Sequence, residues 1–148
     1  MAPQTAFYNL IGMETLGLRM ERACSNAKVL AEFLNTYPDI TVNYPGLACS
    51  PWHDVADKVL ANGYGAILTI RVGSKERAFS VINNLSIPKI VSNIGDTKTL
   101  IIHPESTLNA HSTEKEKEDA GVFDDLIRIS VGIEDIEDLI EDFKAALA

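Results

Sequence analysis

The sequence predicts one domain of alternating helices and strands, and three observations support this. A chain of 148 residues is long enough for a single domain with its own core. Apolar residues recur every three or four positions over 13–34 and 136–147, as in amphipathic helices. The segments 65–72, 99–104 and 125–131 have the apolar composition of strands. Because helices and strands alternate, the pattern by itself favours parallel βαβ units.

The first helix is expected to be long and to have one apolar side. Its apolar stripe is Met13, Leu16, Met20, Ala23, Ala27, Leu30 and Leu34. Arg19, Arg22 and Asn26 lie off this stripe. A helix this long on a small domain usually packs against something larger. We therefore expect part of the stripe to be exposed in the isolated chain and to favour self-association.

The next two elements are a short helix and a strand. Ser50 followed by Pro51 is typical of a helix start, and this helix should extend to about Ala61. Within 65–72 the side chains alternate between two faces of a strand. One face carries Ala66, Leu68, Ile70 and Val72, and the other carries Ile67, Thr69 and Arg71.

The remaining elements have clear boundary signals. Ser74 should cap a helix that carries Phe79, Ile82 and Leu85. Pro88 makes 87–92 an edge strand or a strand flanked by loops, and Pro104 ends the strand that begins at residue 99.

Two further helices are expected near the C-terminal end of the sequence. Thr113 and Glu116 match a capping box, and Gly121 stands where a C-terminal cap belongs. The mixed charges of 114–119 indicate a solvated helix face. The buried stripe of the final helix is Ile136, Leu139, Ile140, Phe143 and Leu147.

Composition excludes several functions. The net charge of −8 argues against nucleic acid and anionic membrane surfaces as partners, because both require a basic patch. The sequence contains no apolar run long enough to span a bilayer and no signal-peptide pattern, and its two cysteines, Cys24 and Cys49, lack CxxC spacing. A reduced, cytoplasmic protein is the simplest interpretation. His53, His103 and His111 have no spacing typical of a metal site.

Arg128 is the most unusual residue of the predicted strands. It stands between Ile127 and Ile129, and alternation places it on the same face as Ser130. The pattern alone favours an arginine on a solvated sheet face. The alternative is a carboxylate clamp, since guanidinium can bind a carboxylate through two parallel hydrogen bonds. The polar loop 92–98 could be a simple turn or could present Asn93 or backbone N–H groups to a ligand.

Several segments together resemble one enzyme family. They are GMETLGLRMER, VNYPGL, GYGAILTI, SNIGDTKTLIIHPEST and DLIRISVGIEDIEDLIEDFKAAL, and they cover nearly the whole chain. In order and spacing they resemble the C-terminal part of the Cys/Met-metabolism family of pyridoxal-phosphate (PLP) enzymes. This family includes cystathionine γ-synthase, methionine γ-lyase and O-acetylhomoserine sulfhydrylase. The last subgroup is the most similar, because it carries asparagine where Asn93 stands, whereas the lyases typically carry serine.

The resemblance implies a role for the unusual arginine. Arg128 matches the family residue that binds the substrate α-carboxylate, and Asn93 matches a loop residue that assists it. The supporting positions are Ser130, Gly132, Glu134 and Thr107. The segment HPESTLN departs from the family pattern HPASTTH, because Leu108 and Asn109 replace a threonine and a histidine that face the site in relatives.

The resemblance also implies a fold, and it implies that substrate binding and PLP binding belong to different domains. The expected fold is α+β, the small C-terminal domain of a fold-type I PLP enzyme. It should have a mostly antiparallel sheet of four or five strands, helices on one face and a long N-terminal helix. Residues 1–148 would form this single substrate-binding domain, without the large PLP-binding domain. None of the eight lysines has the family's S-x-T-K context, so we expect no catalytic residue, covalent PLP or metal in this chain.

The implied function belongs to the complete enzyme. It is the γ-replacement of O-acetyl-L-homoserine by sulfide to give L-homocysteine and acetate. The expected partners are the amino-acid substrate, the missing large domain and a second copy of the enzyme. Two alternatives stay open: the same domain of a cystathionine γ-synthase or methionine γ-lyase, and a free-standing amino-acid-binding or interaction domain without catalysis.

Overall fold

The chain forms a five-stranded sheet in the order β1-β2-β5-β4-β3. A computed structural model describes all 148 residues. The strands are β1 Thr41–Asn43, β2 Ile67–Arg71, β3 Lys89–Ile90, β4 Leu100–Ile102 and β5 Leu126–Ser130. All pairings are antiparallel except that of β3 with β4. The expected α+β fold with a mostly antiparallel sheet is therefore confirmed.

The interpretation as simple parallel βαβ units is wrong, and the strand order explains why. β2 and β3 point the same way and are joined through a helix, as in a βαβ unit. However, β5 lies between β2 and β4 and runs antiparallel to both. The last strand of the sequence therefore occupies the centre of the sheet. Alternation along a chain does not reveal such an insertion.

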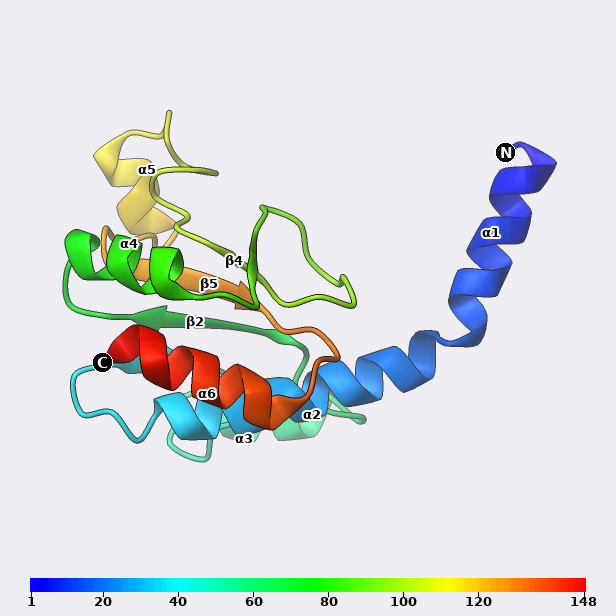
Figure 1. Cartoon of the computed structure of the whole chain (residues 1–148), viewed down its shortest axis with the longest axis horizontal. Coiled ribbons are helices and arrows are strands. Elements are labelled where there is room, and N and C mark those ends of the chain that lie inside the picture. The colour runs from blue at the N-terminus through cyan, green and yellow to red at the C-terminus, as the bar shows by residue number, and fades with distance from the viewer.

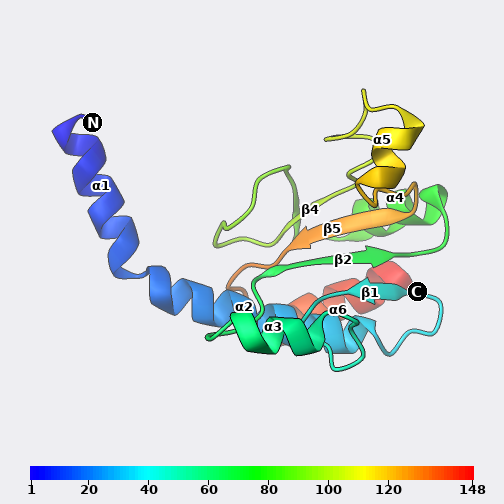
Figure 2. The same ribbon diagram turned by 180° about the vertical axis from the view of Figure 1, so that it is seen from behind.

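Three helices cover one face of the sheet. They are α2 Leu16–Leu34, α4 Lys75–Asn84 and α6 Ile136–Leu147. Figures 1 and 2 show α4 and α6 on the same side of β2 and β5, while α2 packs against both α6 and β2. The short helices α3 His53–Val59 and α5 Glu114–Asp119 lie outside this layer.

The core lies between this helical layer and the sheet. From the two central strands, Leu68, Ile70, Ile127 and Ile129 are at most 1% exposed. Leu30, Leu34, Leu139 and Phe143 face them from α2 and α6 and are fully buried. Each such side chain contributes about 1.5–3 kcal/mol through burial. The predicted faces of the strand at 65–72 are confirmed, since Ile67 and Arg71 are exposed on the other face.

Most predicted helix caps are present. The Ser74 hydroxyl accepts a hydrogen bond from the Arg77 N–H at 3.2 Å, and Asp135 accepts one from Glu137 N–H at 3.0 Å. Thr113 and Glu116 form the predicted capping box of α5. The start predicted at Ser50 is wrong by a few residues. Ser50 accepts the Trp52 N–H within the preceding turn, and α3 itself begins at His53.

The first helical segment is divided in two. A break at Thr15 separates α1 Pro3–Glu14 from α2, and α1 has no buried residue. Figure 1 shows α1 projecting away from the rest of the chain. The predicted stripe is buried from Ala23 to Leu34, whereas Met13 is 65% exposed and Met20 is 40% exposed. The expected exposed part of the stripe is therefore its N-terminal part. No helix of the structure combines the length and apolarity needed to span a membrane.

An ion cluster attaches α5 to α4. The Glu105 carboxylate lies 2.8 Å from Lys75 Nζ and 2.7 Å from Lys117 Nζ, and the Glu105 side chain is 16% exposed. The hydrogen bond from Lys117, together with that from Lys75, lowers the pKa of Glu105 from 4.5 to about 2. The Glu105 carboxylate is therefore ionised at neutral pH, and it binds the ammonium groups of Lys75 and Lys117 at the same time.

We expect Glu105→Gln to destabilise the fold at neutral pH by about 1–2 kcal/mol, because two charged hydrogen bonds at a partly hydrated site are weakened. Since the folded pKa lies below the unfolded value, this stabilisation is fully present above pH 4.5 and is lost as the pH falls toward 2. Urea unfolding at pH 7 and pH 3 should therefore show a smaller difference at pH 3. Glu114→Gln is the control, since that side chain is 92% exposed and contacts only Lys117. Equal losses for both variants would contradict the prediction.

Candidate functional site

The open face of β5 carries the candidate site. Ile127 and Ile129 point into the core, so Arg128 and Ser130 point to the opposite face. Paired residues of antiparallel strands share a face, and Thr69 and Ile67 of β2 therefore lie beside Arg128 and Ser130. Alternation along β5 places both polar side chains on this face, as predicted.

The loop 91–98 is attached to this face by hydrogen bonds that involve both polar side chains, with Arg128 as donor and Ser130 as acceptor. Arg128 Nη2 donates to the backbone oxygens of Ser92 at 2.8 Å and Asn93 at 3.3 Å. Gly95 N–H donates to Ser130 Oγ at 3.2 Å. Arg128 and Asn93 are thus brought together as predicted, but through the Asn93 backbone. The Asn93 side chain is exposed, so its amide is free to meet a ligand.

Arg128 retains most of its hydrogen-bonding capacity. It is half-buried, and only its Nη2 atom donates to protein acceptors. By contrast, Arg71 and Arg77 are paired with the carboxylates of Asp125 and Asp39. None of the ion pairs of the structure includes Arg128. A guanidinium with unused donors and no carboxylate partner is well suited to a planar anion.

Asp96, in the same loop, does not neutralise Arg128. Its Oδ1 atom accepts the Lys98 N–H at 3.0 Å and the Thr97 hydroxyl at 3.3 Å. The backbone hydrogen bond from Lys98 is the main cause that lowers the pKa of Asp96 below its usual value. The carboxylate is therefore ionised and satisfied within its own turn.

The turn after β5 packs tightly against the end of this loop. Gly132 N–H donates to Thr99 Oγ1 at 2.9 Å, and Ile133 N–H donates to Thr97 O at 2.9 Å. A side chain at Gly132 would collide with the backbone of Thr97 and Lys98 and with the Glu134 carboxylate. Gly132 therefore allows two backbone segments to approach closely. This is the structural role of Gly132, one of the supporting positions predicted from the sequence.

Glu134 and Asn26 complete this contact. Glu134 Oε1 accepts Thr99 N–H at 2.5 Å, and Oε2 accepts the Thr99 hydroxyl at 2.8 Å. Asn26 Nδ2 donates to Gly132 O at 3.1 Å and Glu134 O at 2.9 Å. Sequence reasoning assigned no role to Asn26 or Thr99. The prediction that Asn26 lies off the apolar stripe is wrong, because the residue is 2% exposed and stands at helical spacing between Ala23 and Leu30.

Thr107 lies in the turn that follows β4 and forms no hydrogen bond with Arg128 or with the loop 91–98. Its hydroxyl donates to His103 O at 2.7 Å, and the residue is exposed. The His103 ring supports this turn. Since Asp124 O can only accept, His103 Nε2 carries the proton at 2.7 Å from it, and Nδ1 is left to accept from Ser106. His103 thus has a structural role, and Thr107 supports the turn that displays the exposed Leu108.

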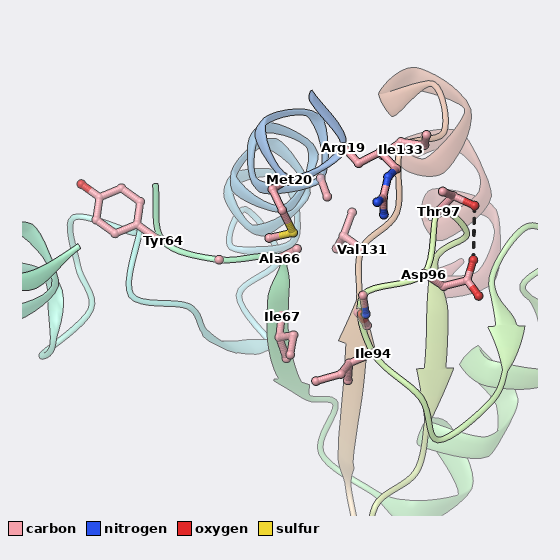
Figure 3. Close-up of a pocket in the computed structure, with 14 residues that line it drawn as sticks. Arg19, Met20, Tyr64, Ala66, Ile67, Ile94, Asp96, Thr97, Val131 and Ile133 are labelled. Atoms are coloured by element: carbon pink, nitrogen blue, oxygen red, sulfur yellow. Dashed lines mark hydrogen bonds between the residues drawn. The ribbon is translucent and has the colours of Figure 1, made fainter. Parts of the chain in front are cut away.

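A cavity of about 420 Å³ opens beside the loop, between α2 and the ends of β2 and β5. Ile67 of β2 and Ile94 of the loop both line it, and Figure 3 shows the Met20 side chain extending from α2 toward Ala66. Arg19 and Asp96 are its charged residues, and no lysine lines it. The structure gathers no group of three His, Cys, Asp or Glu side chains suited to a metal ion.

Comparison with known proteins identifies the family to which this fold belongs. Residues 1–148 match the family model described as Cys/Met metabolism PLP-dependent enzyme. The chain belongs to this family of PLP-dependent enzymes.

Similar proteins include several enzymes of sulfur amino-acid metabolism. The chain is 42% identical to an L-methionine gamma-lyase of Fusobacterium nucleatum subsp. polymorphum, over 99% of this chain and 38% of the relative. It is 45% identical to a homocysteine synthase of Schizosaccharomyces pombe, over 98% of this chain and 34% of the relative. It is 43% identical to an O-acetyl-L-homoserine sulfhydrylase 1 of Thermus thermophilus, over 100% of this chain and 36% of the relative. The chain thus spans little more than a third of their length.

Solved structures agree with the fold. An O-acetylhomoserine (thiol)-lyase from Campylobacter jejuni matches with a TM-score of 0.94 and 39% identity, over 99% of this chain and 35% of that one. That structure contains N'-pyridoxyl-lysine-5'-monophosphate. An O-acetylhomoserine sulfhydrylase from Wolinella succinogenes matches with a TM-score of 0.86 and 35% identity, over 100% of this chain and 39% of that one.

Proposed function

We propose that this chain is the substrate-binding domain of a PLP-dependent O-acetyl-L-homoserine sulfhydrylase. The reaction replaces the acetate at the γ-carbon by sulfide and yields L-homocysteine and acetate. The observation that carries the proposal is Arg128, a half-buried guanidinium with unused donors and no carboxylate partner. We assign the substrate α-carboxylate to Arg128, assisted by the exposed side-chain amide of Asn93.

The residues of this chain would contribute to the reaction by binding and orientation. A two-point contact between Arg128 and the carboxylate fixes the amino acid relative to the reacting groups, which lowers the entropic part of the barrier. Ser130, through the Gly95 N–H, holds the loop that faces the ligand. When PLP is bound, it supplies the electron sink that the chemistry at the substrate carbons requires.

We assign PLP binding to the remainder of the complete enzyme, which corresponds to the part of the relatives that this chain does not cover. Lys75 and Lys117 are paired with Glu105, and none of the residues lining the cavity is a lysine. Within this proposal, residues 1–148 form one substrate-binding domain, and a large domain provides the lysine and the phosphate site.

The exposed apolar residues of α1 and early α2 would pack against that domain or a second copy of the enzyme. They include Phe7, Leu10, Met13 and Leu16.

A second candidate is a methionine γ-lyase, since one of the similar relatives carries that name at 42% identity. Asn93 favours the sulfhydrylase, because the resemblance associates asparagine at this position with that subgroup. The third possibility, an amino-acid-binding or interaction domain without catalysis, requires that the chain act alone.

One experiment separates these possibilities. The complete PLP-loaded enzyme should form homocysteine from O-acetyl-L-homoserine and sulfide faster than it releases methanethiol from L-methionine. The isolated chain, incubated with PLP, should show neither turnover nor an absorbance band of lysine-bound PLP that a single lysine substitution removes. Faster methanethiol release would assign the chain to the lyases. Amino-acid binding by the isolated chain, with no complete enzyme active on either substrate, would favour the third possibility.

A further inference from the structure

We propose that Thr99 is a positioning residue for the substrate carboxylate, acting with Glu134 and Asn26 as a latch that holds the loop 91–98 in place over Arg128. This inference rests on the proposed function of Arg128. The latch is defined by three side chains, Thr99, Glu134 and Asn26.

Thr99 is the centre of the latch. It is fully buried, yet its hydroxyl both donates to Glu134 Oε2 at 2.8 Å and accepts from Gly132 N–H at 2.9 Å. Its own N–H donates to Glu134 Oε1 at 2.5 Å. A buried hydroxyl that satisfies a donor and an acceptor at once cannot be replaced by an apolar side chain without leaving Gly132 N–H unpaired.

The loop depends on such hydrogen bonds because none of its residues is buried. Every residue from 91 to 98 is exposed. The loop is held to β5 and its following turn by Arg128, Ser130 and the Ile133 N–H, and the latch secures the residue at which it ends. If Thr99 releases the turn, the carbonyl oxygens of Ser92 and Asn93 are free to shift. The Arg128 guanidinium, which bonds to them, then loses its fixed orientation.

Asn26 connects the latch to α2. It is 2% exposed, and its amide reaches the carbonyl oxygens of both Gly132 and Glu134. Arg22 adds a longer hydrogen bond to Glu134 O at 3.4 Å. These hydrogen bonds connect the loop to α2, the helix that follows the exposed α1. A displacement of α2 would therefore reach the carboxylate site through the latch.

The test measures how strongly the complete PLP-loaded enzyme recognises a carboxylate. L-norvaline and n-butylamine differ only by that group. The competitive inhibition constant of n-butylamine divided by that of L-norvaline therefore reports the contribution of the carboxylate to binding. We expect Thr99→Val to reduce this ratio about five- to tenfold, with the inhibition constant of n-butylamine unchanged, as expected from the loss of one well-oriented hydrogen bond. Thr99→Ser, which keeps the hydroxyl, should restore the ratio.

Controls distinguish positioning from general destabilisation. Thr36→Val removes a hydroxyl that donates to Phe33 O at 2.7 Å, far along the chain from the loop, and should leave the ratio unchanged. If Thr99→Val does not fold, Glu134→Gln provides the same test with the side-chain volume retained. A lower melting temperature with an unchanged ratio in either latch variant would overturn the inference. An unchanged ratio in Arg128→Ala would instead overturn the proposed function.

Discussion

Replacing Arg128 by alanine in the complete enzyme should lower kcat/KM for O-acetyl-L-homoserine far more than it lowers stability. Removing one member of a charged hydrogen-bonded pair typically costs about 2–5 kcal/mol of binding, or roughly 30- to several thousandfold. Stability should change little, because Arg128 forms no ion pair within the protein and uses only Nη2 for internal hydrogen bonds. Steady-state kinetics and urea unfolding of the same variant measure both quantities.

Arg128→Lys should also be impaired, because an ammonium group cannot form the planar two-point contact of guanidinium. Arg77→Ala is the matched control. Arg77 is similarly half-buried but is paired with Asp39, so its loss should affect stability and leave kcat/KM close to normal. Near-normal kinetics in both Arg128 variants would contradict the prediction and favour the alternative that Arg128 is a solvated residue of the sheet.

Gly132→Ala should cause a large loss of stability. The added Cβ would overlap the backbone of Thr97 and Lys98 and the Glu134 carboxylate. Two of these neighbours are backbone atoms that cannot move aside without opening the contact between the loop and the turn. We expect a loss of about 2–3 kcal/mol in the free energy of unfolding, typical of overpacking at a rigid site.

Gly12→Ala provides the opposite case. Gly12 lies within α1, and a Cβ there would meet no atom within 4 Å. Because alanine favours the helix by about 0.5–1 kcal/mol over glycine, this variant should not be destabilised. Urea unfolding of both variants beside the parent measures the difference. If the two substitutions had equal effects, the close approach at Gly132 would not be what makes glycine necessary there.

Arg128 shows how far sequence reasoning reached at the candidate site. Alternation placed it on the open face of its strand, and the structure agrees. The resemblance associated it with Asn93, and the loop contacts bring the two together through the Asn93 backbone. Thr99 and Asn26 were missed. Their hydrogen-bond partner Gly132 lies more than thirty positions from Thr99 and more than a hundred from Asn26, and a local pattern identifies no partner at such distances.

The sequence by itself determined the features that depend on neighbouring residues. These are the capping box at Thr113, the two faces of β2 and the buried side of α6, because capping and periodicity act within a few residues. Only the tertiary structure decided that β5 lies between β2 and β4 and that the loop 91–98 covers Arg128. Strand order and loop contacts join residues far apart in the chain, so they follow from the packing of the whole domain.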